Sequence, residues 1–421
     1  MKHWGRILLA LMLCAAMTAG MLPGTLNTAR ADKWINGLGT GDLCQNYEVS
    51  YGYYSGDEPM IYRVLEVNTT EYGGTTMLLD SIYTLYNFKI EFDYNQHPKN
   101  ATNVWADCSL RAWLNGDDFL NNPDIFTDAE RDAIAFSTKA APSAADGTVV
   151  DNDFDKNAYE FAPLNNDRIF VLDALELMRY LPADQIRLRL KARDDYWTRS
   201  KCIDESGEDN QVWAAQPAVH RFSAGVHTGV SPTFNVNLSS VIFTTMDNGG
   251  GIFTLLDNRM SISADASGIS RDGNTVTVPY TITGDNAGNA DRVTVLILDS
   301  EYVPGKATTD GFTYLKLSVD NFGTSGTGTF TLPDKYASKA CGTDYWVYIL
   351  AEDERERYYT DSASAPVSIT VPAAPAREKA TPKAVPKTGD SGNPVLWSGM
   401  VLLGIAGLAV LSFLKVSRKR K

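Results

Sequence analysis

The chain has 421 residues, of which 51 are acidic and 38 basic, and its formal net charge at pH 7 is −13. Nine of the basic residues lie near the two ends, so the span from Asp32 to Pro386 carries 50 acidic and 29 basic side chains. Such a surface argues against nucleic acid and anionic lipid as partners and favours cations or a basic partner. The length is sufficient for two ordinary domains with cores of their own.

The first residues have the pattern of a secretory signal peptide. Lys2 and Arg6 precede an apolar run from Ile7 to Ala19, and Ala29-Arg30-Ala31 is a small-x-small cleavage site. The apolar run is shorter than the roughly 20 residues that span a bilayer. We therefore expect residues 1–31 to be removed on export, so that the mature protein begins at Asp32.

Residues 32–250 alternate strand-like and helix-like stretches, which predicts an α+β head domain. Ile61 to Val67 and Thr76 to Leu79 are rich in β-branched and aliphatic residues and flank Gly73-Gly74, a pattern typical of a hairpin. The apolar stretch from Arg168 to Leu172 predicts a buried strand.

Three short helices are predicted in the same span. From Ser109 onward, Leu110, Trp113 and Leu114 fall on one helical face, and Asn115-Gly116 ends that helix. Two further helices begin at capping boxes, which are formed by Thr127 with Glu130 and by Asp173 with Glu176.

The head also contains four short motifs: Trp105-x-x-Cys108-x-Leu110-Arg111-x-Trp113-Leu114-Asn115, Arg168-Ile169-Phe170-Val171-Leu172, Tyr196-Trp197-Thr198-Arg199-Ser200 and Gly229-Val230-Ser231-Pro232. Together they resemble an uncharacterised domain family of secreted bacterial proteins, which usually has serine at Cys108, leucine at Thr198 and arginine at Ser231. The pattern is similar to C-type-lectin-like and formylglycine-generating-enzyme-like folds. That likeness implies an architecture and cannot carry a function by itself.

Four cysteines remain after signal cleavage, namely Cys44, Cys108, Cys202 and Cys341. An exported protein can form disulfides, and four cysteines allow three pairings. We predict one bond, between Cys108 and Cys202. No cysteine lies at zinc-ligand spacing from a histidine, so no structural metal is predicted.

Candidate catalytic groups lie near Cys202. His220 and His227 are seven residues apart, and Asp194 or Asp195 is available to orient an imidazole, so a Cys/His nucleophilic pair is conceivable. Surface histidines beside a structural cysteine are the favoured interpretation. A redox pair of Cys108 and Cys202 is a further alternative, although neither flank shows an activated thiolate. No catalytic residue is assigned.

The sequence of the head suggests two kinds of binding site. Asp151-Asn152-Asp153-Phe154-Asp155 begins like a calcium loop, but Lys156 replaces the required glycine and Ala162 the bidentate glutamate, which excludes an EF-hand-type site. A solvated acidic loop is the favoured interpretation, and a looser calcium site is the alternative. Trp105, Trp113 and Trp197 are expected in the core. Trp213 and surface tyrosines remain as candidates for stacking against sugar rings, without the calcium-dependent motifs of C-type lectins.

Residues 251–371 change to strand-type periodicity. Val276, Val278, Tyr280 and Ile282 alternate with polar residues, as do Trp346, Tyr348 and Leu350. Alternation of this kind predicts half-buried strands, and turn signals recur between them without a helical pattern. The expected fold is an immunoglobulin-like β-sandwich.

The C-terminal residues carry an ordered set of signals. A Pro-rich linker at 372–386 precedes Val385-Pro386-Lys387-Thr388-Gly389, an apolar helix at 395–414 and a basic tail that ends at residue 421. The helix is long enough to span a bilayer, and the tail stays in the cytoplasm by the positive-inside rule. Proline in the pentapeptide disfavours helix and keeps it extended.

The pentapeptide resembles the Leu-Pro-x-Thr-Gly sorting signal of sortase substrates in Gram-positive bacteria, with Val385 in place of leucine, which leaves the class of sortase open. The resemblance implies that a sortase cysteine attacks the carbonyl of Thr388, releases the chain from Gly389 onward and joins Thr388 to an amine of peptidoglycan. Thr388 then becomes the mature C-terminus.

We therefore expect an extracellular protein anchored to the cell wall, with a membrane-inserted precursor. A distal head without a recognisable catalytic constellation favours an adhesin-like or ligand-binding role, with a glycan or protein as ligand. A wall-attached hydrolase or Cys-dependent oxidase is the alternative, and a passive spacer is the third. No cofactor is predicted.

Overall fold

The computed structural model of the chain describes residues 33–35, 48–54, 58–85, 89–95, 97–142, 154–181, 191, 195–203, 210–216, 218–247, 250–305, 312–355 and 360–374. By its contacts the chain divides into residues 1–374 and 375–421. The predicted signal peptide, the linker beyond Ala374, the sorting signal at 385–389 and the apolar helix at 395–414 lie outside the described residues. Within the described ranges, no helix has the length and apolarity to cross a membrane.

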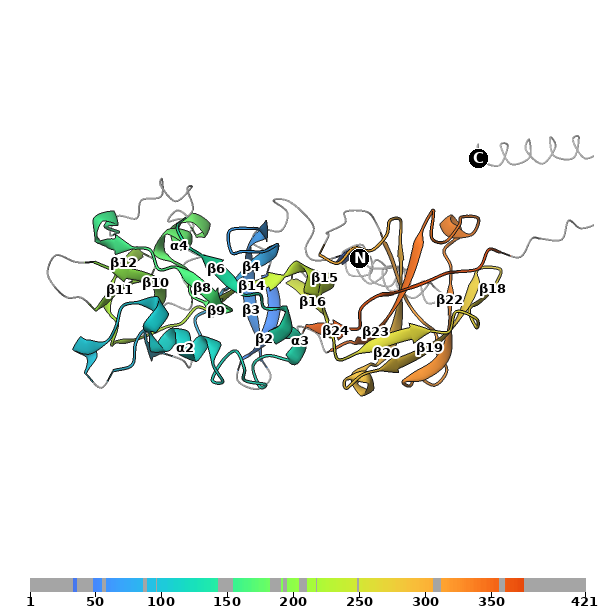
Figure 1. Ribbon diagram of the computed structural model, residues 1–421, viewed down its shortest axis with the longest axis horizontal. Coiled ribbons are helices and arrows are strands. Elements are labelled where there is room, and N and C mark those ends of the chain that lie inside the picture. Colours follow the sequence, from blue (N-terminus) through green and yellow to red (C-terminus); the bar gives the residue numbers. More distant parts are fainter. Residues whose placement is uncertain are drawn as a thin grey trace, which may run out of the picture. The chain divides into compact units, whose positions relative to one another are not determined.

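A thirteen-stranded sheet runs through the described chain in the order β21-β20-β23-β24-β16-β2-β3-β4-β14-β9, with β1, β15 and β25 paired beside this path (Figure 1). Its strands from the first half are β1 (Lys33–Ile35), β2 (Glu48–Tyr54), β3 (Glu58–Thr69), β4 (Thr76–Ser81), β9 (Ile169–Phe170), β14 (Thr233–Asn237), β15 (Val241–Asp247) and β16 (Gly250–Leu256). Its strands from the second half are β20 (Arg292–Leu298), β21 (Phe312–Lys316), β23 (Trp346–Asp353), β24 (Asp361–Ala363) and β25 (Val367–Ile369).

Smaller sheets complete the first half. One has the order β12-β11-β10-β7, and two pairs join β13 to β5 and β6 to β8. Their bounds are β5 (Ile90–Glu91), β6 (Ser137–Lys139), β7 (Tyr159–Glu160), β8 (Leu164–Asp167), β10 (Tyr196–Cys202), β11 (Gln211–Gln216), β12 (Ala218–Ser223) and β13 (His227–Thr228).

The predicted local elements of the head are confirmed. β3 and β4 form the antiparallel hairpin around Gly73-Gly74. The helices are α2 (Ser109–Asn115), α3 (Asp128–Ala133) and α4 (Ala174–Tyr180), and both capping boxes form, at Thr127 with Glu130 and at Asp173 with Glu176. The strand expected at 168–172 is shorter, because only Ile169 and Phe170 pair, with β14.

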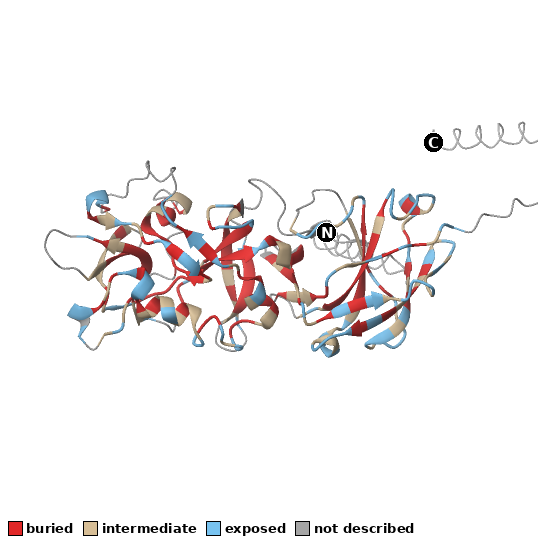
Figure 2. Cartoon of the chain, viewed as in Figure 1, coloured by how far each residue is buried: buried red, intermediate tan, exposed pale blue. Residues whose placement is uncertain are grey.

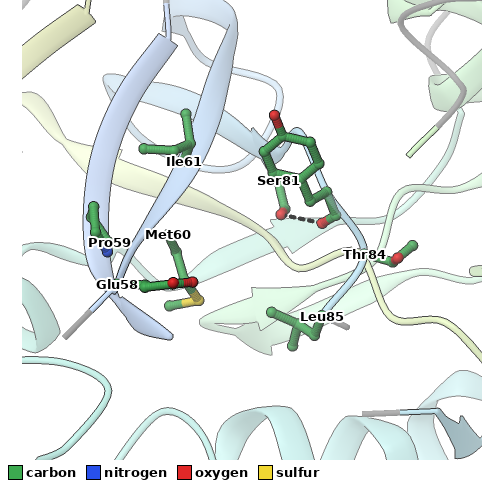
Figure 3. Close-up of a pocket in the computed structure, with 8 residues that line it drawn as sticks. Glu58, Pro59, Met60, Ile61, Ser81, Thr84 and Leu85 are labelled. Atoms are coloured by element: carbon green, nitrogen blue, oxygen red, sulfur yellow. Dashed lines mark hydrogen bonds between the residues drawn. The ribbon is translucent and has the colours of Figure 1, made fainter. Parts of the chain in front are cut away.

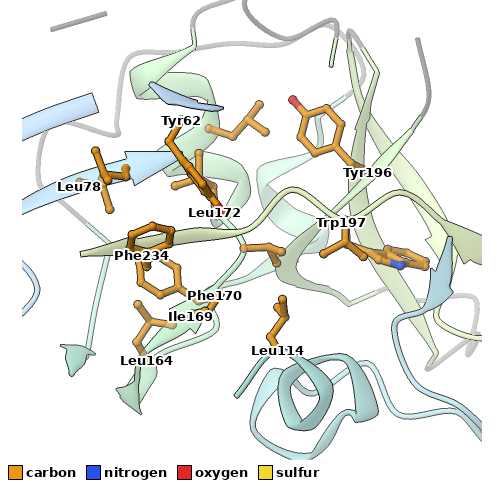
Figure 4. Close-up of a cluster of buried hydrophobic side chains, with 14 of the residues drawn as sticks. Tyr62, Leu78, Leu114, Leu164, Ile169, Phe170, Leu172, Tyr196, Trp197 and Phe234 are labelled. Atoms are coloured by element: carbon orange, nitrogen blue, oxygen red, sulfur yellow. The ribbon is translucent and has the colours of Figure 1, made fainter. Parts of the chain in front are cut away.

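One large apolar core fills the head. It includes motif residues such as Leu114, Ile169, Phe170 and Trp197, and Figure 4 shows Ile169 and Phe170 beside Phe234 from β14. Figure 2 shows buried residues concentrated on the strands and the inner sides of the helices. The recognisable motifs of the head therefore build its interior.

In residues 260–371 two sheets share a second core. One sheet consists of β17 (Ser261–Ala264), β18 (Ser270–Asp272), β19 (Thr275–Thr283) and β22 (Ser325–Thr331), and the other is the β20, β21, β23 and β25 part of the long sheet. The expected alternation of β19 is confirmed, since Val276, Val278, Tyr280 and Ile282 all enter this core.

β23 differs from the half-buried strand that its alternation predicted. Val347 and Ile349 face the second core, whereas Tyr348 and Leu350 enter a third apolar cluster with Ile242 and Phe243 of β15. Both faces of β23 are therefore buried. The alternation in the sequence predicted one buried face of β23 and gave no sign that residues of the head cover the other face.

Strand pairing continues across the predicted boundary at residue 250. β16 starts at Gly250 and pairs antiparallel with β15 and parallel with both β2 and β24.

A buried carboxylate also connects distant segments. Glu130 of α3 accepts hydrogen bonds from Gly52 N at 2.9 Å and from the Thr360 hydroxyl. Gly52 has φ 69°, and a Cβ there would lie 2.6 Å from the Phe126 ring, so glycine is required at this bend of β2.

Candidate functional site

The most polar of the four motifs forms a buried ion pair. Arg199 is fully buried on β10 and makes two hydrogen bonds to the Glu176 carboxylate, of 2.6 and 2.7 Å, and further bonds to the carbonyl oxygens of Ala162 and Val171. Burial by itself raises the pKa of Glu176, but Arg199 and Lys139 outweigh it and hold that pKa at about 2. The pair is satisfied on both sides, which is the pattern of a structural element.

Asn115 and Arg111 connect α2 to the strand motif. Asn115 Oδ1 accepts hydrogen bonds from Arg168 N and Ile169 N, both at 3.0 Å, and its Nδ2 donates to Ile169 O at 2.8 Å. Arg111 Nε donates to the Asp167 carboxylate. These bonds satisfy backbone groups next to β9 and assign a structural role to two motif residues.

The expected disulfide between Cys108 and Cys202 is not formed, since both side chains are thiols. Cys108 is the N-cap of α2, where its sulfur accepts from Arg111 N at 3.4 Å and donates to Trp105 O at 3.3 Å. Burial raises the pKa of the Cys108 thiol to about 12. The sulfur of Cys202 lies 4.0 Å from Gln211 Oε1. Cys341 is also a thiol, and Cys44 lies outside the described residues.

The structure brings His220 and Asp195 together. His220 Nε2 lies 3.0 Å from Asp195 Oδ1, its Nδ1 lies 3.0 Å from Ala218 O, and its ring packs edge-on against Phe222. None of these three contacts is a hydroxyl or a thiol. His227 is on another strand, with Nδ1 3.6 Å from Glu91 Oε1, and Asp194 lies outside the described residues.

The tryptophan predictions are partly wrong. Trp105 and Trp197 are in the core as expected, but Trp213 is fully buried as well, and its Nε1 donates to Ala158 O at 3.3 Å. A buried ring cannot stack against a sugar. The exposed aromatic side chains of the described residues include Tyr83, Tyr94, Phe136 and Phe322.

No group of three or more potential metal ligands occurs in the described ranges. The loop at 151–153 that begins like a calcium site lies outside them.

The candidate binding site is a pocket at the open end of the β3–β4 hairpin, with a volume of about 230 Å³ (Figure 3). We call it the Tyr83 pocket, lined by Glu58, Pro59, Met60, Ile61, Ser81, Tyr83, Thr84 and Leu85. The pocket forms because β3 begins at Glu58, whereas its pairing with β4 begins only at Tyr62, which lies opposite Ser81. The residues after Ser81 turn away and leave a space beside the first residues of β3.

The Tyr83 pocket has an apolar floor and a polar rim. Met60 and Leu85 are 5% and 4% exposed, whereas Tyr83 is 57% exposed. The Ser81 hydroxyl donates to Tyr83 O and the Thr84 hydroxyl to Lys191 O, so both fix the backbone of the rim. An exposed ring above apolar side chains suits a sugar face or an apolar side chain of a partner.

Backbone geometry at this edge disfavours an added strand. Ile61 O accepts from Ile82 N at 3.1 Å, so the backbone of Ile61 points to the pocket side of β3. Pro59, two residues earlier, points the same way and has no N–H to donate. The pocket therefore favours a compact ligand over an extended peptide. Sequence reasoning missed this site, and its one signal was a tyrosine just past a strand.

Comparisons with known proteins show a likeness to one family over part of the chain and no activity. No curated protein matches the sequence. Among solved structures, a DUF3823 family protein from Bacteroides ovatus is similar at 12% identity and a TM-score of 0.18, over 33% of this chain and 80% of that one. Residues 73–238 match the family described as Domain of unknown function (DUF6273). This range contains all four motifs, and the head of the chain is thus similar to a family of unknown function.

Proposed function

We propose that the protein is a surface protein that sortase attaches covalently to peptidoglycan, with a head that binds an extracellular ligand. The order of the terminal signals supports the attachment: a signal peptide, and then, after the folded residues, Val385-Pro386-Lys387-Thr388-Gly389, an apolar helix and a basic tail. The partners are then sortase and peptidoglycan, and the location is the cell wall.

The observation that carries the binding role is the Tyr83 pocket. Its exposed ring, apolar floor and fixed rim provide the features of a small preformed site. The ligand class that fits is a glycan ring or an apolar side chain on a protein surface. A C-type-lectin-like assignment of the head and an immunoglobulin-like assignment of residues 251–371 belong to the same proposal, and the second is supported by two sheets around one core.

An enzymatic role is the second candidate because His220 lies 3.0 Å from Asp195. Two observations weigh against it. The Cys108 thiol is buried with a raised pKa, which keeps it protonated at neutral pH. The polar motif residues Arg199, Asn115 and Arg111 are engaged in bonds inside the fold.

The attachment is tested by replacing the residue whose carbonyl sortase would attack. Thr388→Ala should move the protein from the wall fraction to the membrane fraction or the medium. The control, Ser391→Ala, lies just beyond the pentapeptide and should leave the wall attachment unchanged. Fractionation and immunoblotting measure the distribution. Unchanged wall attachment of Thr388→Ala would refute the anchoring proposal.

The binding role is tested by applying residues 32–374 to an array of glycans, mucins and matrix proteins, with and without calcium. Tyr83→Ala should weaken the selective signal by about tenfold or more, since it removes the exposed ring. Tyr94→Ala is the matched control, because Tyr94 is 71% exposed and does not line the pocket. Equal loss in both variants, or no selective signal from folded protein, contradicts this site.

A further inference from the structure

A second cleft lies at the other end of the β3–β4 hairpin and has a volume of about 480 Å³. It is formed between the hairpin turn at Gly73 to Thr76, the segment after α3, Arg168 and Asn237. We call it the Phe136 cleft. It shares no lining residue with the Tyr83 pocket, so a ligand in one leaves the other free.

The basic group of the Phe136 cleft is Arg168. Its backbone N donates to Asn115 Oδ1 at 3.0 Å and its Nε to Ile134 O at 3.2 Å. Asp132 also lines the cleft, but its carboxylate is 3.0 Å from Arg259 Nη1. Among the described residues, no carboxylate lies within ion-pair distance of Arg168.

Among the described residues, Arg63 and Arg271 also have no carboxylate within ion-pair distance, but the other arginines do. The guanidinium groups of Arg111, Arg131, Arg179, Arg199, Arg259 and Arg292 all have carboxylate partners. Arg168 is half-buried, and burial lowers its pKa, whereas the nearby Asp132 carboxylate acts in the opposite direction but is itself paired with Arg259. An anionic ligand would stabilise the charged guanidinium further.

An aromatic ring completes the cleft. Phe136 is 67% exposed, and the Arg168 guanidinium lies 5.5 Å from the centre of its ring. The ring is held on fixed backbone, because Ala135 N donates to Asn235 O at 2.7 Å and Ile134 forms a bridge with Val236. A rigid apolar face therefore stands beside a cation.

We propose that the Phe136 cleft binds a sugar acid, a hexuronic or sialic acid residue, with its carboxylate on Arg168 and the apolar face of its ring on Phe136. Arginine matches a carboxylate through paired donors, and the C–H face of a pyranose packs on an aromatic ring. Asn237 and Thr75 lie in the same lining and offer hydrogen-bonding groups for sugar hydroxyls. This assignment goes beyond the ligand of the Tyr83 pocket and does not depend on it.

The test uses the purified full-length chain in mild detergent, with glucuronic acid and N-acetylneuraminic acid as probes and glucose and N-acetylglucosamine as neutral controls. Saturation-transfer NMR and calorimetry should detect the acids and not the neutral sugars. Arg168→Gln should weaken binding by about tenfold or more, since a charged hydrogen-bonded pair is lost.

Phe136→Ala provides the second variant, because an exposed ring can be removed without loss of the core, and it should weaken binding of the acids and reduce saturation transfer to their ring protons. Tyr94→Ala is the control and should bind both acids as the parent does, because Tyr94 is 71% exposed and lines neither site. The proposal is overturned if neutral sugars bind equally well, if neither acid binds at millimolar concentration, or if Phe136→Ala binds like the parent. Loss in Tyr83→Ala alone would place the ligand in the Tyr83 pocket and overturn it too.

Discussion

The side chain of Cys108 lies in a position that suits a hydroxyl better than a thiol. Its sulfur is the N-cap of α2 and interacts with Arg111 N and Trp105 O. Sulfur is a weak acceptor, whereas serine is among the preferred N-cap residues.

We therefore expect Cys108→Ser to raise the free energy of unfolding by about 0.5–1 kcal/mol, because the hydroxyl makes both bonds with better geometry. Cys108→Ala should lower it by about 1 kcal/mol through loss of the cap. Urea denaturation followed by tryptophan fluorescence measures both. A serine variant less stable than the alanine variant would show that the sulfur is needed for packing and not for capping.

Residue-level prediction from sequence succeeded where the signal is local. The capping boxes at Thr127 and Asp173 depend on residues three positions apart, so spacing alone identifies them. The burial of Trp213 depends on Ala158 and Phe154, which are distant in the sequence. No local pattern distinguishes such a tryptophan from one on the surface.

At the scale of elements, the buried ammonium group next to β4 belongs to Lys191, which lies outside the helices and strands. Asp80 of β4 forms an ion pair with Lys191 and accepts a hydrogen bond from the Thr233 hydroxyl at 2.9 Å. Lys191 Nζ also donates a hydrogen bond to Ser231 Oγ. Lys191 and Asp80 are both 1% exposed at the side chain. Ser231 Oγ lies 3.4 Å from Asp80 Oδ1, so an arginine at position 231 would bring a cation to the same carboxylate from beside β14.

Lys191→Met should lower the free energy of unfolding by about 3–5 kcal/mol, since it leaves the Asp80 carboxylate buried without a counter-ion. Adding Ser231→Arg to this variant should recover a large part of the loss. Thermal and urea unfolding of the two single variants and the double variant form the cycle. If the double variant is no more stable than Lys191→Met, the exchange of cations between the two segments is refuted.

The hairpin and the three helices could be predicted because each is encoded by neighbouring residues. The pairing of β16 could not, since its partners β2 and β24 are far away in both directions along the chain. Periodicity indicates which face of a strand is buried and says nothing about which strand lies next to it. For the same reason neither pocket was foreseen, because each is lined by segments that only the fold brings together.

On the scale of the whole molecule, the third apolar cluster connects the two halves of residues 33–374. Ile242 and Phe243 from β15 pack with Leu296, Tyr348 and Leu350 from β20 and β23. A chain cut at the predicted boundary would expose these side chains and would separate β16 from β15 and β2.

We expect residues 32–374 to unfold in one cooperative transition, because the halves share a sheet and a cluster. The separate fragments 32–249 and 250–374 should each be less stable and more prone to aggregate, since the cut exposes apolar surface and strand edges. Calorimetry and near-UV circular dichroism of the three proteins check this. Two well-resolved transitions in the intact chain, matching those of the fragments, would contradict it.

The position of β24 also sets when folding can finish. Thr254 of β16 pairs with Asp361, and contacts between residues so distant in sequence form slowly, because a long loop must close first. A chain made from its N-terminus presents β16 long before β24 exists, so one edge of the sheet and the Phe243 surface stay uncovered during that interval. Pairing of β24 with β16 is therefore expected to be a late step of folding, and incomplete chains that lack β24 should be prone to aggregate.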